Sequence, residues 1–437
     1  MGAIAAKFGG SSLADAGHFK QVRAIVAADD RRRYIIPSAP GKRYNRDRKV
    51  TDLLYACYEN AGERETFDPL FDRIGKRYRE IIAELKIDFD IGPMLKEVRR
   101  DIRAGASADY TASRGEYLNG LILAAFLGYD FVDPAGMIFF DAEGRYDHEA
   151  SIRAVAETLS DHERAVIPGF YGSDPEGNIK TFTRGGSDIT GAIVAGAIGA
   201  ELYENWTDVD GFLMADPSIV EDPRPIGYIT YKELRELSYM GAKVLHEDAI
   251  FPVKHAGISI NIRNTDNPDA PGTMIVGDDE TVPQTGRITG VAGKKNFTVI
   301  GIEKALMNSQ IGFARKLLSI IERHHISFEH MPSGIDSISL VVSDAELAGK
   351  ADTVIRDIEE ALTPDMVYMN PHMSLIATVG LGMARTPGMA SRLFSALSDA
   401  GINVRMIDQG SSELNIIIGV ENEEYERTIR VIYEAFI

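Results

Sequence analysis

The sequence predicts an α/β domain with a mainly parallel sheet, followed by two small modules of βαββαβ topology. Up to about residue 280, short apolar runs of strand length alternate with segments of helical periodicity. This alternation is typical of a sheet that helices cover on both faces. Beyond that point, a segment that begins at Gly312 recurs at Gly388. The chain has 437 residues, which is long enough for separate hydrophobic cores in the domain and the modules.

The elements of the first domain are assigned from their length and periodicity. Strands are expected in the runs GAIAAKF (2–8), RYIIPS (33–38), YDFVD (129–133), RAVIPGF (164–170), ELYENWT (201–207) and ISINIRN (258–264). Helices are expected at 13–28, 51–61, 67–84, 107–127, 148–160, 187–199 and 231–239. The stretch 264–286 is rich in Pro, Gly, Asp and Asn, and it predicts the exit from a domain that covers 1–280.

The repeat in the last part of the chain runs without gaps over a helix, a strand, a turn and a second strand. The copies match at an offset of 76 positions: Gly312 with Gly388, Ala314 with Ala390, Leu317 with Leu393, Ser319 with Ser395, Ile326 with Ile402 and Gly334 with Gly410. Each copy has its own preceding strand and following helix, so βαββαβ units are expected at 287–370 and 371–437. A duplicated module without an obvious nucleophile favours a sensor or a dimerisation element, and a merely structural duplication is the alternative.

The charge balance limits the classes of partner. The chain carries 65 acidic and 47 basic side chains, for a net charge of −18, which argues against a general binder of nucleic acid or anionic membranes. Cys57 is the only cysteine, so a disulfide within the chain is impossible and a small core residue is expected. The N-terminal sequence lacks the features of a signal peptide and no run has membrane-spanning length, so a cytoplasmic protein is expected.

The first strand leads into KFGGSS (7–12), a turn suited to phosphate. Gly9 and Gly10 free backbone amides at an expected helix N-terminus, and Lys7 adds a positive charge. The spacing is neither that of a Walker loop nor that of a dinucleotide fingerprint. By itself the motif is a weak signal, because many strand-to-helix turns contain two glycines.

A second glycine turn, TFTRGGSDIT (181–190), places Arg184 and Asp188 close together. The simple interpretation is a strand-to-helix bend with Ser187 or Asp188 as the N-cap. In SRGEYLNG (113–120), Glu116 is expected near the start of a helix, where an acid complements the dipole and would suit an ammonium ligand.

Further polar residues follow other strands. PSAPGK (37–42) ends the second strand, where Ser38 and Thr51 offer hydroxyl groups, and the basic loop at 42–49 is interpreted as solvated. Thr207 and Asp208 come just after a strand, where open α/β sheets bind ligands, and Lys243 follows later.

Together these turns present Lys7, Arg184 and Lys243 on glycine-rich backbone, with Glu116 and Asp188. Fixed cations of this kind are what phosphoryl transfer requires, because its catalysis is mostly positioning and neutralisation of charge. The spacing suggests neither a nucleophile–histidine triad nor a zinc-ligand cluster.

The motifs KFGGSS, SAPGK with VTDLL, SRGE, FTRGGSD, WTDVDG and GAKVLH occur in this order, and with them the chain resembles the aspartate kinases over essentially its whole length. The resemblance implies an amino-acid-kinase fold, a three-layer αβα sandwich, followed by two ACT domains. It implies phosphorylation of the side-chain carboxylate of L-aspartate by MgATP, giving 4-phospho-L-aspartate and ADP, the first step toward lysine, threonine and methionine. No homoserine dehydrogenase segment follows, so a monofunctional member is expected.

The resemblance also implies roles for individual residues. Lys7 would contact the transferring phosphoryl group, and Asp188 would orient the lysine. Arg184 would pair with an aspartate carboxylate and Glu116 would receive the ammonium. The substrate pocket would be completed by Ser38, Thr51 and Ser187. The nucleotide would be held by Lys7, Gly9, Gly10, Thr207, Asp208 and Lys243. Mg²⁺ is expected as a cofactor, with no protein ligand assigned.

The chain departs from the family at two positions of the nucleotide site. The family usually has arginine after the Asp-Pro of this region, but Ser218 follows Asp216 and Pro217, and Leu213 stands where tyrosine is common. These departures put the affinity for ATP in question. Arg224 is nearby in sequence and is a candidate replacement.

The ACT resemblance implies a homodimer, or a dimer of dimers, regulated by lysine or threonine. Glu329 lies in the expected strand of ISFEHMPSGID (326–336), where a carboxylate suits the ε-ammonium of lysine, and Met307, Ser309 and Phe313 would line the rest of the site. The alternative is that Glu329 points into solvent. For the whole chain, the alternatives are a sibling carboxylate kinase of the same fold and a non-catalytic amino-acid sensor.

Overall fold

The computed structural model describes residues 2–183, 185–242, 247–278 and 288–437, and the chain forms two compact units. Unit 1 consists of Met1–Phe212, Pro225–Tyr231 and Val244–Val282, and unit 2 consists of Leu213–Arg224, Lys232–Lys243 and Pro283–Ile437. Both units are therefore discontinuous in the sequence. The domain boundaries at 280, 287 and 370 stay predictions.

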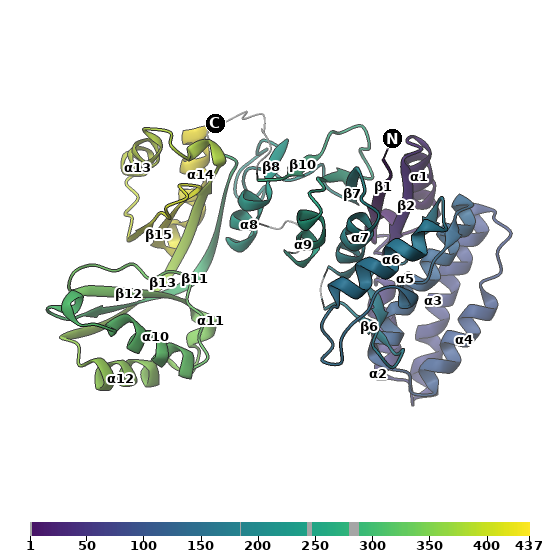
Figure 1. Cartoon of the computed structure of the whole chain (residues 1–437), viewed down its shortest axis with the longest axis horizontal. Coiled ribbons are helices and arrows are strands. Elements are labelled where there is room, and N and C mark those ends of the chain that lie inside the picture. The colour runs from purple at the N-terminus through teal and green to yellow at the C-terminus, as the bar shows by residue number, and fades with distance from the viewer. Residues whose placement is uncertain (1, 184, 243–246, 279–287) are drawn as a thin grey trace. The chain divides into compact units, whose positions relative to one another are not determined.

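Unit 1 is built on an eight-stranded sheet in the order β3-β4-β2-β1-β7-β9-β10-β8 (Figure 1). The strands are β1 (Ile4–Phe8), β2 (Arg32–Pro37), β3 (Asp130–Phe131), β4 (Ala165–Val166), β7 (Leu202–Thr207), β8 (Tyr228–Thr230), β9 (Ile260–Asn264) and β10 (Thr273–Val276). Neighbouring strands are parallel except for β9 and β10. The predicted α/β fold with a mainly parallel sheet is thus confirmed.

Helices cover both faces of this sheet, because both faces of its strands are apolar. On the face of Ala6 and Phe8, a core forms with α1 (Ala16–Ala27), α2 (Val50–Glu59), α3 (Arg64–Leu85), α4 (Gly92–Arg103) and α5 (Ala108–Leu127). On the face of Lys7, α7 (Gly186–Ala197) packs against β1 and β7, and α6 (His148–Ser160) and α9 (Glu247–His255) pack against α7. In the described parts of the chain, no helix combines the length and apolar character needed to cross a bilayer.

Some elements of unit 1 escaped the sequence analysis. The stretch 264–286 was expected to be a domain exit, but it contains β10, a four-residue strand of the sheet. Helices α4 and α9 and strand β5 (Tyr171–Ser173) were also not predicted. A strand was expected before RGGSD, but its pairing as β6 (Ile179–Thr181) in a hairpin with β5 was not. These segments are short or contain proline or glycine nearby, so their periodicity is weak, and tertiary packing decides their structure.

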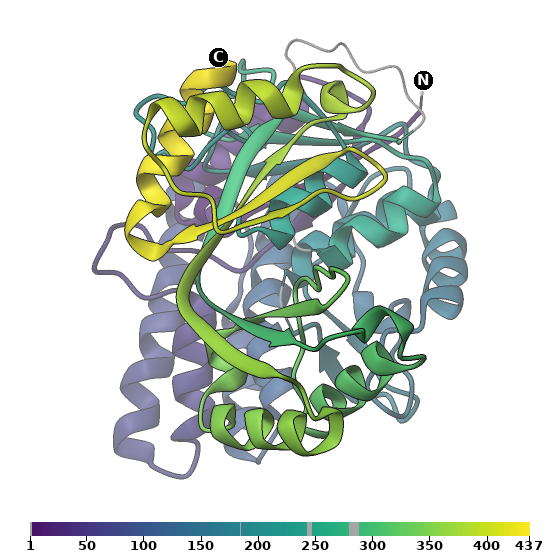
Figure 2. The same ribbon diagram turned by 90° about the vertical axis from the view of Figure 1, so that its left-hand side faces the viewer.

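Unit 2 contains a five-stranded antiparallel sheet in the order β12-β11-β13-β15-β14. Its strands are β11 (Gly290–Glu303), β12 (Ser337–Ser343), β13 (Met366–Val379), β14 (Met406–Asp408) and β15 (Asn415–Glu421). Figure 2 shows that the long strands β11 and β13 run through both repeats. One end of the sheet packs on α10 (Phe313–Arg323) and α12 (Ala351–Leu362), and the other packs on α13 (Met389–Asp399) and α14 (Tyr425–Phe436).

The two repeats are structurally equivalent at their helix starts. Gly312 and Gly388 are the N-cap residues of α10 and α13, with φ angles of 81° and 89°. Positive φ angles favour glycine, which explains the match. The copies differ in the strand that follows the helix: the second copy has β14, whereas the first has two isolated bridges, His330 with Val341 and Ser333 with Ile338. The strand expected around Glu329 is therefore not regular.

The core of the second repeat also receives a segment from the middle of the chain. Ala215 and Val220 are buried in it, and Met214 packs against it. The backbone N–H of Val291 donates to Met214 O at 2.7 Å. Residues Leu213–Arg224 thus belong to unit 2 structurally, although they lie between strands of unit 1 in sequence.

Candidate active site

The candidate site lies at the carboxyl ends of β1, β2 and β7, where the order of the sheet reverses around β1. The loops after these strands approach each other closely. The N–H of Gly41 donates to Gly10 O at 2.6 Å, and the N–H of Gly9 donates to Trp206 O at 3.0 Å. A Cβ atom on Gly10 would lie 2.7 Å from Ala39 O, so only glycine fits there. Open α/β sheets bind ligands at this kind of switch point.

Three polar side chains meet in this crevice. Lys7 Nζ lies 2.6 Å from Asp188 Oδ1 and 3.2 Å from Asn205 Oδ1. The amide Nδ2 of Asn205 donates to the same Asp188 oxygen at 3.0 Å. Lys7 and Asn205 are register partners across β1 and β7, and both are buried. We refer to Lys7, Asp188 and Asn205 as the lysine cluster.

Glu116 is buried beside the loop that follows β2. Burial raises the pKa of its carboxyl group to about 8, and the backbone N–H of Ala39 lowers it by a smaller amount. Its Oε2 atom is buried without a hydrogen-bond partner. The expectation that Glu116 lies near the start of a helix was wrong, because it lies in the middle of α5 (Ala108–Leu127), too far from the first turn to benefit from the dipole. A buried acid with one unpartnered oxygen suits a cationic ligand.

The other predicted residues of the site lie on neighbouring turns. Ser38 follows β2, and its N–H donates to Phe8 O at 3.0 Å. Thr51 is in the first turn of α2, and Ser187 is buried in the first turn of α7. Thr207 ends β7, and its hydroxyl donates to the exposed Asp208 at 3.1 Å.

Two predicted cations cannot be placed. Arg184 and Lys243 lie outside the described residues.

The glycine turn after β1 leads into a 3₁₀ turn, Ser11–Leu13, and α1 begins only at Ala16. The expectation of two free amides at a helix N-terminus was therefore wrong: the N–H of Gly9 already donates to Trp206 O, and Gly9 and Gly10 precede a 3₁₀ turn and not the first turn of an α-helix.

The basic loop at 42–49 is only partly solvated. Residues 42–46 are exposed, as expected, but Asp47 is buried. Hydrogen bonds from Arg43 hold the pKa of Asp47 well below its usual range, with a further contribution from Arg77. Arg77, buried on α3, also donates to Gly41 O and to Ala14 O. This arginine joins the loops after β1 and β2, a role that the sequence analysis missed.

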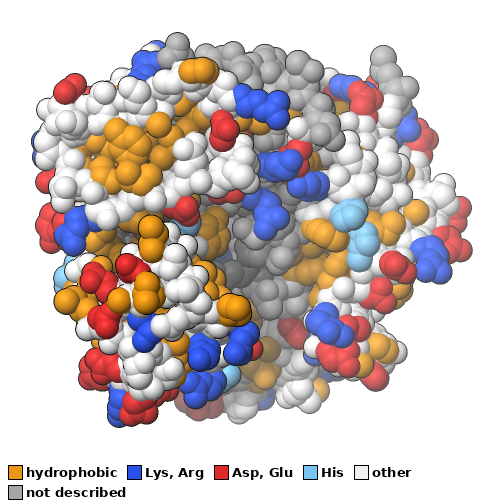
Figure 3. Space-filling view, turned by 60° about the vertical axis from the view of Figure 1, so that its left-hand side comes forward, with side chains coloured by type: hydrophobic (Ala, Val, Ile, Leu, Met, Phe, Trp, Pro, Cys, Tyr) orange, Lys and Arg blue, Asp and Glu red, His pale blue; other side chains and the backbone are white. Residues whose placement is uncertain are grey.

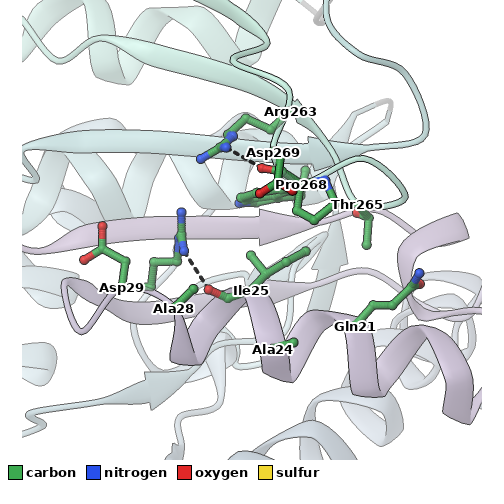
Figure 4. Close-up of a pocket in the computed structure, with 11 residues that line it drawn as sticks. Gln21, Ala24, Ile25, Ala28, Asp29, Arg263, Thr265, Pro268 and Asp269 are labelled. Atoms are coloured by element: carbon green, nitrogen blue, oxygen red, sulfur yellow. Dashed lines mark hydrogen bonds between the residues drawn. The ribbon is translucent and has the colours of Figure 1, made fainter.

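A separate cavity of about 420 Å³ lies between α1 and the loop after β9 (Figure 4). The two arginines that line it are paired with buried Glu204: Arg32 Nε lies 2.7 Å and Arg263 Nη1 lies 3.6 Å from its carboxylate. Trp206 Nε1 donates to the same carboxylate at 2.8 Å. Side chains alternate along a strand, so Glu204 and Trp206 point away from the face that carries Asn205. The sheet therefore separates this cavity from the lysine cluster.

The positions that depart from the family belong to unit 2. Ser218 lies in a turn that the Asp216 side chain closes: the N–H and the hydroxyl of Ser218 both donate to Asp216 Oδ1, at 2.8 and 2.6 Å. Leu213 is exposed. The backbone N–H of Arg224 donates to the Tyr433 hydroxyl at 2.9 Å.

The proposed effector residues lie in the first repeat of unit 2. Met307 and Phe313 are buried in its core, and the Ser309 hydroxyl donates to Leu306 O at 2.9 Å. Glu329 is half-buried, and its backbone N–H donates to Val341 O at 2.8 Å. The next residue, His330, pairs through Nδ1 with Asp408 on β14 at 2.6 Å, which ties the loop to the second repeat.

Figure 3 shows basic and acidic side chains interspersed over the visible face, with apolar patches between them. In the described ranges, no group of three or more His, Cys, Asp or Glu side chains could hold a metal ion.

A mainly parallel sheet with the fixed positive charge of Lys7 at its switch point is the arrangement that a phosphoryl-transfer enzyme of the α/β class needs. The model of the amino acid kinase family matches residues 3–264, and an ACT domain model matches 376–436. The chain belongs to the amino acid kinase family.

Known relatives narrow the class. The chain is 37% identical over 445 residues to aspartokinase 3 of Bacillus subtilis, covering 98% of each sequence. The crystal structure of Clostridium acetobutylicum aspartate kinase matches with 56% identity and a TM-score of 0.93, over 99% of this chain and 100% of that one. Escherichia coli aspartokinase III in complex with lysine and aspartate matches with 25% identity and a TM-score of 0.71, over 99% of both chains.

Proposed function

We infer that this protein is an aspartate kinase, which transfers the γ-phosphoryl group of ATP to the side-chain carboxylate of L-aspartate. The observation that carries the inference is the lysine cluster at the switch point, with Glu116 buried on α5 beside the loop after β2. This arrangement occurs in a chain similar over its whole length to aspartate kinases. The products are 4-phospho-L-aspartate and ADP, and the reaction begins a biosynthetic route to amino acids.

Each residue of the site has a role in this reaction. The Lys7 ammonium neutralises charge on the transferring phosphoryl group, and Asp188 orients the lysine. Glu116 as a carboxylate receives the aspartate ammonium, and Arg184 pairs bidentately with a substrate carboxylate, which favours arginine over lysine. Ser38, Thr51 and Ser187 complete the substrate pocket. The nucleotide contacts Gly9, Gly10, Thr207, Asp208 and Lys243.

Mg²⁺ belongs to this proposal as a partner of the nucleotide. The described residues offer no cluster of acids or histidines that could form a protein cage for it. Mg²⁺ often keeps water and is held largely by substrate phosphates. We therefore assign it no protein ligand and no step.

A trapping assay tests the proposed function. The full-length protein is incubated with ATP, Mg²⁺ and hydroxylamine, and with aspartate, glutamate, acetylglutamate or carbamate as acceptor. Formation of a hydroxamate with aspartate alone is expected. Turnover of another acceptor would identify a sibling kinase, and absence of turnover with every acceptor would favour the sensor alternative.

The departure at Ser218 predicts weak binding of ATP. The Ser218→Arg variant is expected to bind ATP more tightly by about 1 kcal/mol, or about fivefold in Kd, if the new guanidinium reaches a phosphate. Calorimetric titration of ATP into both proteins measures the change. Equal affinities would show that another group fills the role, and Arg224→Ala would then weaken binding.

We also propose that the protein is a homodimer joined through its ACT repeats and inhibited by L-lysine. Glu329 is half-buried, and no ion pair of its carboxylate is found among the described residues. This leaves it able to receive an ε-ammonium group, with Met307, Ser309 and Phe313 as the walls of the site.

The Glu329→Gln variant is expected to need at least about tenfold more lysine for half-inhibition, because the charge-assisted hydrogen bond is lost. Inhibition is measured with lysine, threonine and both together. The control is Glu322→Gln, which removes an exposed acid of α10 and is expected to change nothing. Inhibition by threonine alone, or unchanged lysine inhibition in the Glu329 variant, would refute the assignment.

A further inference from the structure

The lysine cluster contains a residue that no motif explains. Asn205 is only 4% exposed, and it contacts both ionised members of the cluster. Its Oδ1 accepts from Lys7 Nζ at 3.2 Å, and its Nδ2 donates to Asp188 Oδ1 at 3.0 Å. A single uncharged side chain therefore satisfies a cation and an anion at the same time.

The contact with Asn205 limits how the Lys7 ammonium can use its hydrogen-bond donors. A lysine ammonium has three N–H donors. Asp188 and Asn205 fix two of them, which leaves one N–H for an oxygen of the phosphoryl group. Lysine is a flexible side chain with several rotatable bonds, so two fixed contacts define the direction of the third donor far better than one.

The charge of the cluster explains why an amide is suited to this position. Lys7 and Asp188 together are neutral, and Asn205 adds no charge. A carboxylate at position 205 would place two anions around one ammonium and make the cluster net negative. A polyphosphate would then be repelled from the place where the proposed reaction needs positive charge.

We propose that Asn205 is a positioning residue, which orders Lys7 against Asp188 without reducing the positive charge available to the phosphoryl group. The proposal rests on the proposed function, in which Lys7 contacts the transferring phosphoryl group. The pairing of β1 with β7 places Asn205 directly opposite Lys7, so the fold itself supplies the contact.

The Asn205→Leu variant tests the positioning role. Leucine has a similar size but makes no hydrogen bond, so kcat is expected to fall about 10- to 100-fold, the scale of a small misplacement of a catalytic group. The KM for aspartate is expected to change less than about twofold, because the proposed function assigns the binding of aspartate to other residues, Glu116 and Arg184 among them. The control is Asn261→Leu, a buried asparagine on the neighbouring strand β9. Equal losses of kcat in the two variants would overturn the proposal.

The Asn205→Asp variant tests the role through the pH dependence of its activity, which a merely structural role of Asn205 would not change. A protonated carboxyl group can accept from Lys7 and donate to Asp188, as the amide does, whereas a carboxylate can only accept. Two carboxyl groups that share one site hold a proton more tightly than usual. The activity of the variant relative to wild type is therefore expected to rise at least about tenfold between pH 8 and pH 6. A constant ratio over this range would overturn the proposal.

Titration of ATP alone separates this inference from the proposed function. The Asn205→Asp variant is expected to bind ATP at least about fivefold more weakly than wild type at pH 8 and nearly equally at pH 6. This result does not depend on which acceptor the enzyme uses. A wild-type protein that ignores aspartate would refute the function only, whereas ATP affinities that match at pH 8 would refute the role of Asn205.

Discussion

The Lys7→Ala variant is expected to fold normally and to turn over aspartate about a thousandfold more slowly than the wild type. The magnitude is the scale of losing a fixed charge on a transferring phosphoryl group. Removal of the ammonium also leaves Asp188 in the crevice with only Asn205 as a donor, so the site loses positive charge and gains an unbalanced anion. The kcat from a coupled ADP assay at saturating substrates measures the effect.

The matched control is Lys20→Ala, which removes an exposed lysine of α1 and is expected to keep full activity. Circular dichroism and the thermal midpoint of both variants should resemble those of the wild type. Turnover within a few-fold of normal in Lys7→Ala would remove Lys7 from the mechanism.

The affinity for aspartate is expected to depend on pH through Glu116. Its pKa is about 8 in the ligand-free protein, so most molecules carry the protonated, uncharged form at neutral pH. Only the carboxylate attracts the ammonium of the substrate. The value of kcat/KM for aspartate should therefore rise about tenfold per pH unit up to about pH 8 and level off above it, because kcat/KM reports groups of the free enzyme.

The Glu116→Gln variant is expected to lose this pH dependence and most of its affinity for aspartate. The exposed Glu97 of α4 provides a control, since Glu97→Gln should keep the wild-type profile. A wild-type kcat/KM that stays flat between pH 6 and pH 8 would contradict the role of Glu116.

The same substitution should stabilise the ligand-free protein at alkaline pH. The folded-state pKa of about 8 lies above the ordinary value of 4.5, so the folded state binds more protons than the unfolded state between these values. The contribution of Glu116 to the free energy of unfolding must therefore fall as pH rises from about 4.5 to 8. At about 1.4 kcal/mol per pH unit, the upper limit of this loss is roughly 5 kcal/mol. Glutamine avoids it, so the difference in thermal midpoint should grow from pH 5 to pH 8.

The elements that the sequence predicted well are those whose residue pattern is set by local structure along the chain. Buried parallel strands such as β1 and β7 read as apolar runs. Lys7 lies in β1 just before a glycine turn, and Asp188 lies in the first turn of α7 just after a second glycine pair. The repeat could be aligned because Gly312 and Gly388 need the same positive φ angle. In each case a local requirement selects the residue type, and a single sequence shows it.

The residues that sequence missed depend on contacts across the fold. Nothing in ENWTDVDG distinguishes Asn205 until β1 and β7 are paired and Lys7 lies opposite it. The burial of Asp47 inside a basic loop requires Arg77 from α3. Glu116 was placed near a helix start because its segment was identified by motif, whereas its unusual pKa results from burial by α5 and the loop after β2. One signal in the sequence could have found Asn205. Side chains alternate along a strand, so Asn205 lies on the same face of β7 as Thr207, which was already a predicted site residue.

The packing of Leu213–Arg224 into unit 2 determines where the protein can be truncated or recombined. A polypeptide that ends at residue 280 would keep Met214, Ala215 and Val220 but lose the repeat in which they are buried. These apolar side chains would then meet water, and such a truncation should be prone to aggregation unless they are replaced by polar residues. The same contact limits a hybrid protein whose regulatory modules come from a relative, because residues 213–224 of the kinase part would have to pack into a foreign module. The recombined half must bring along its own version of this twelve-residue segment, because the segment and the module have to fit each other.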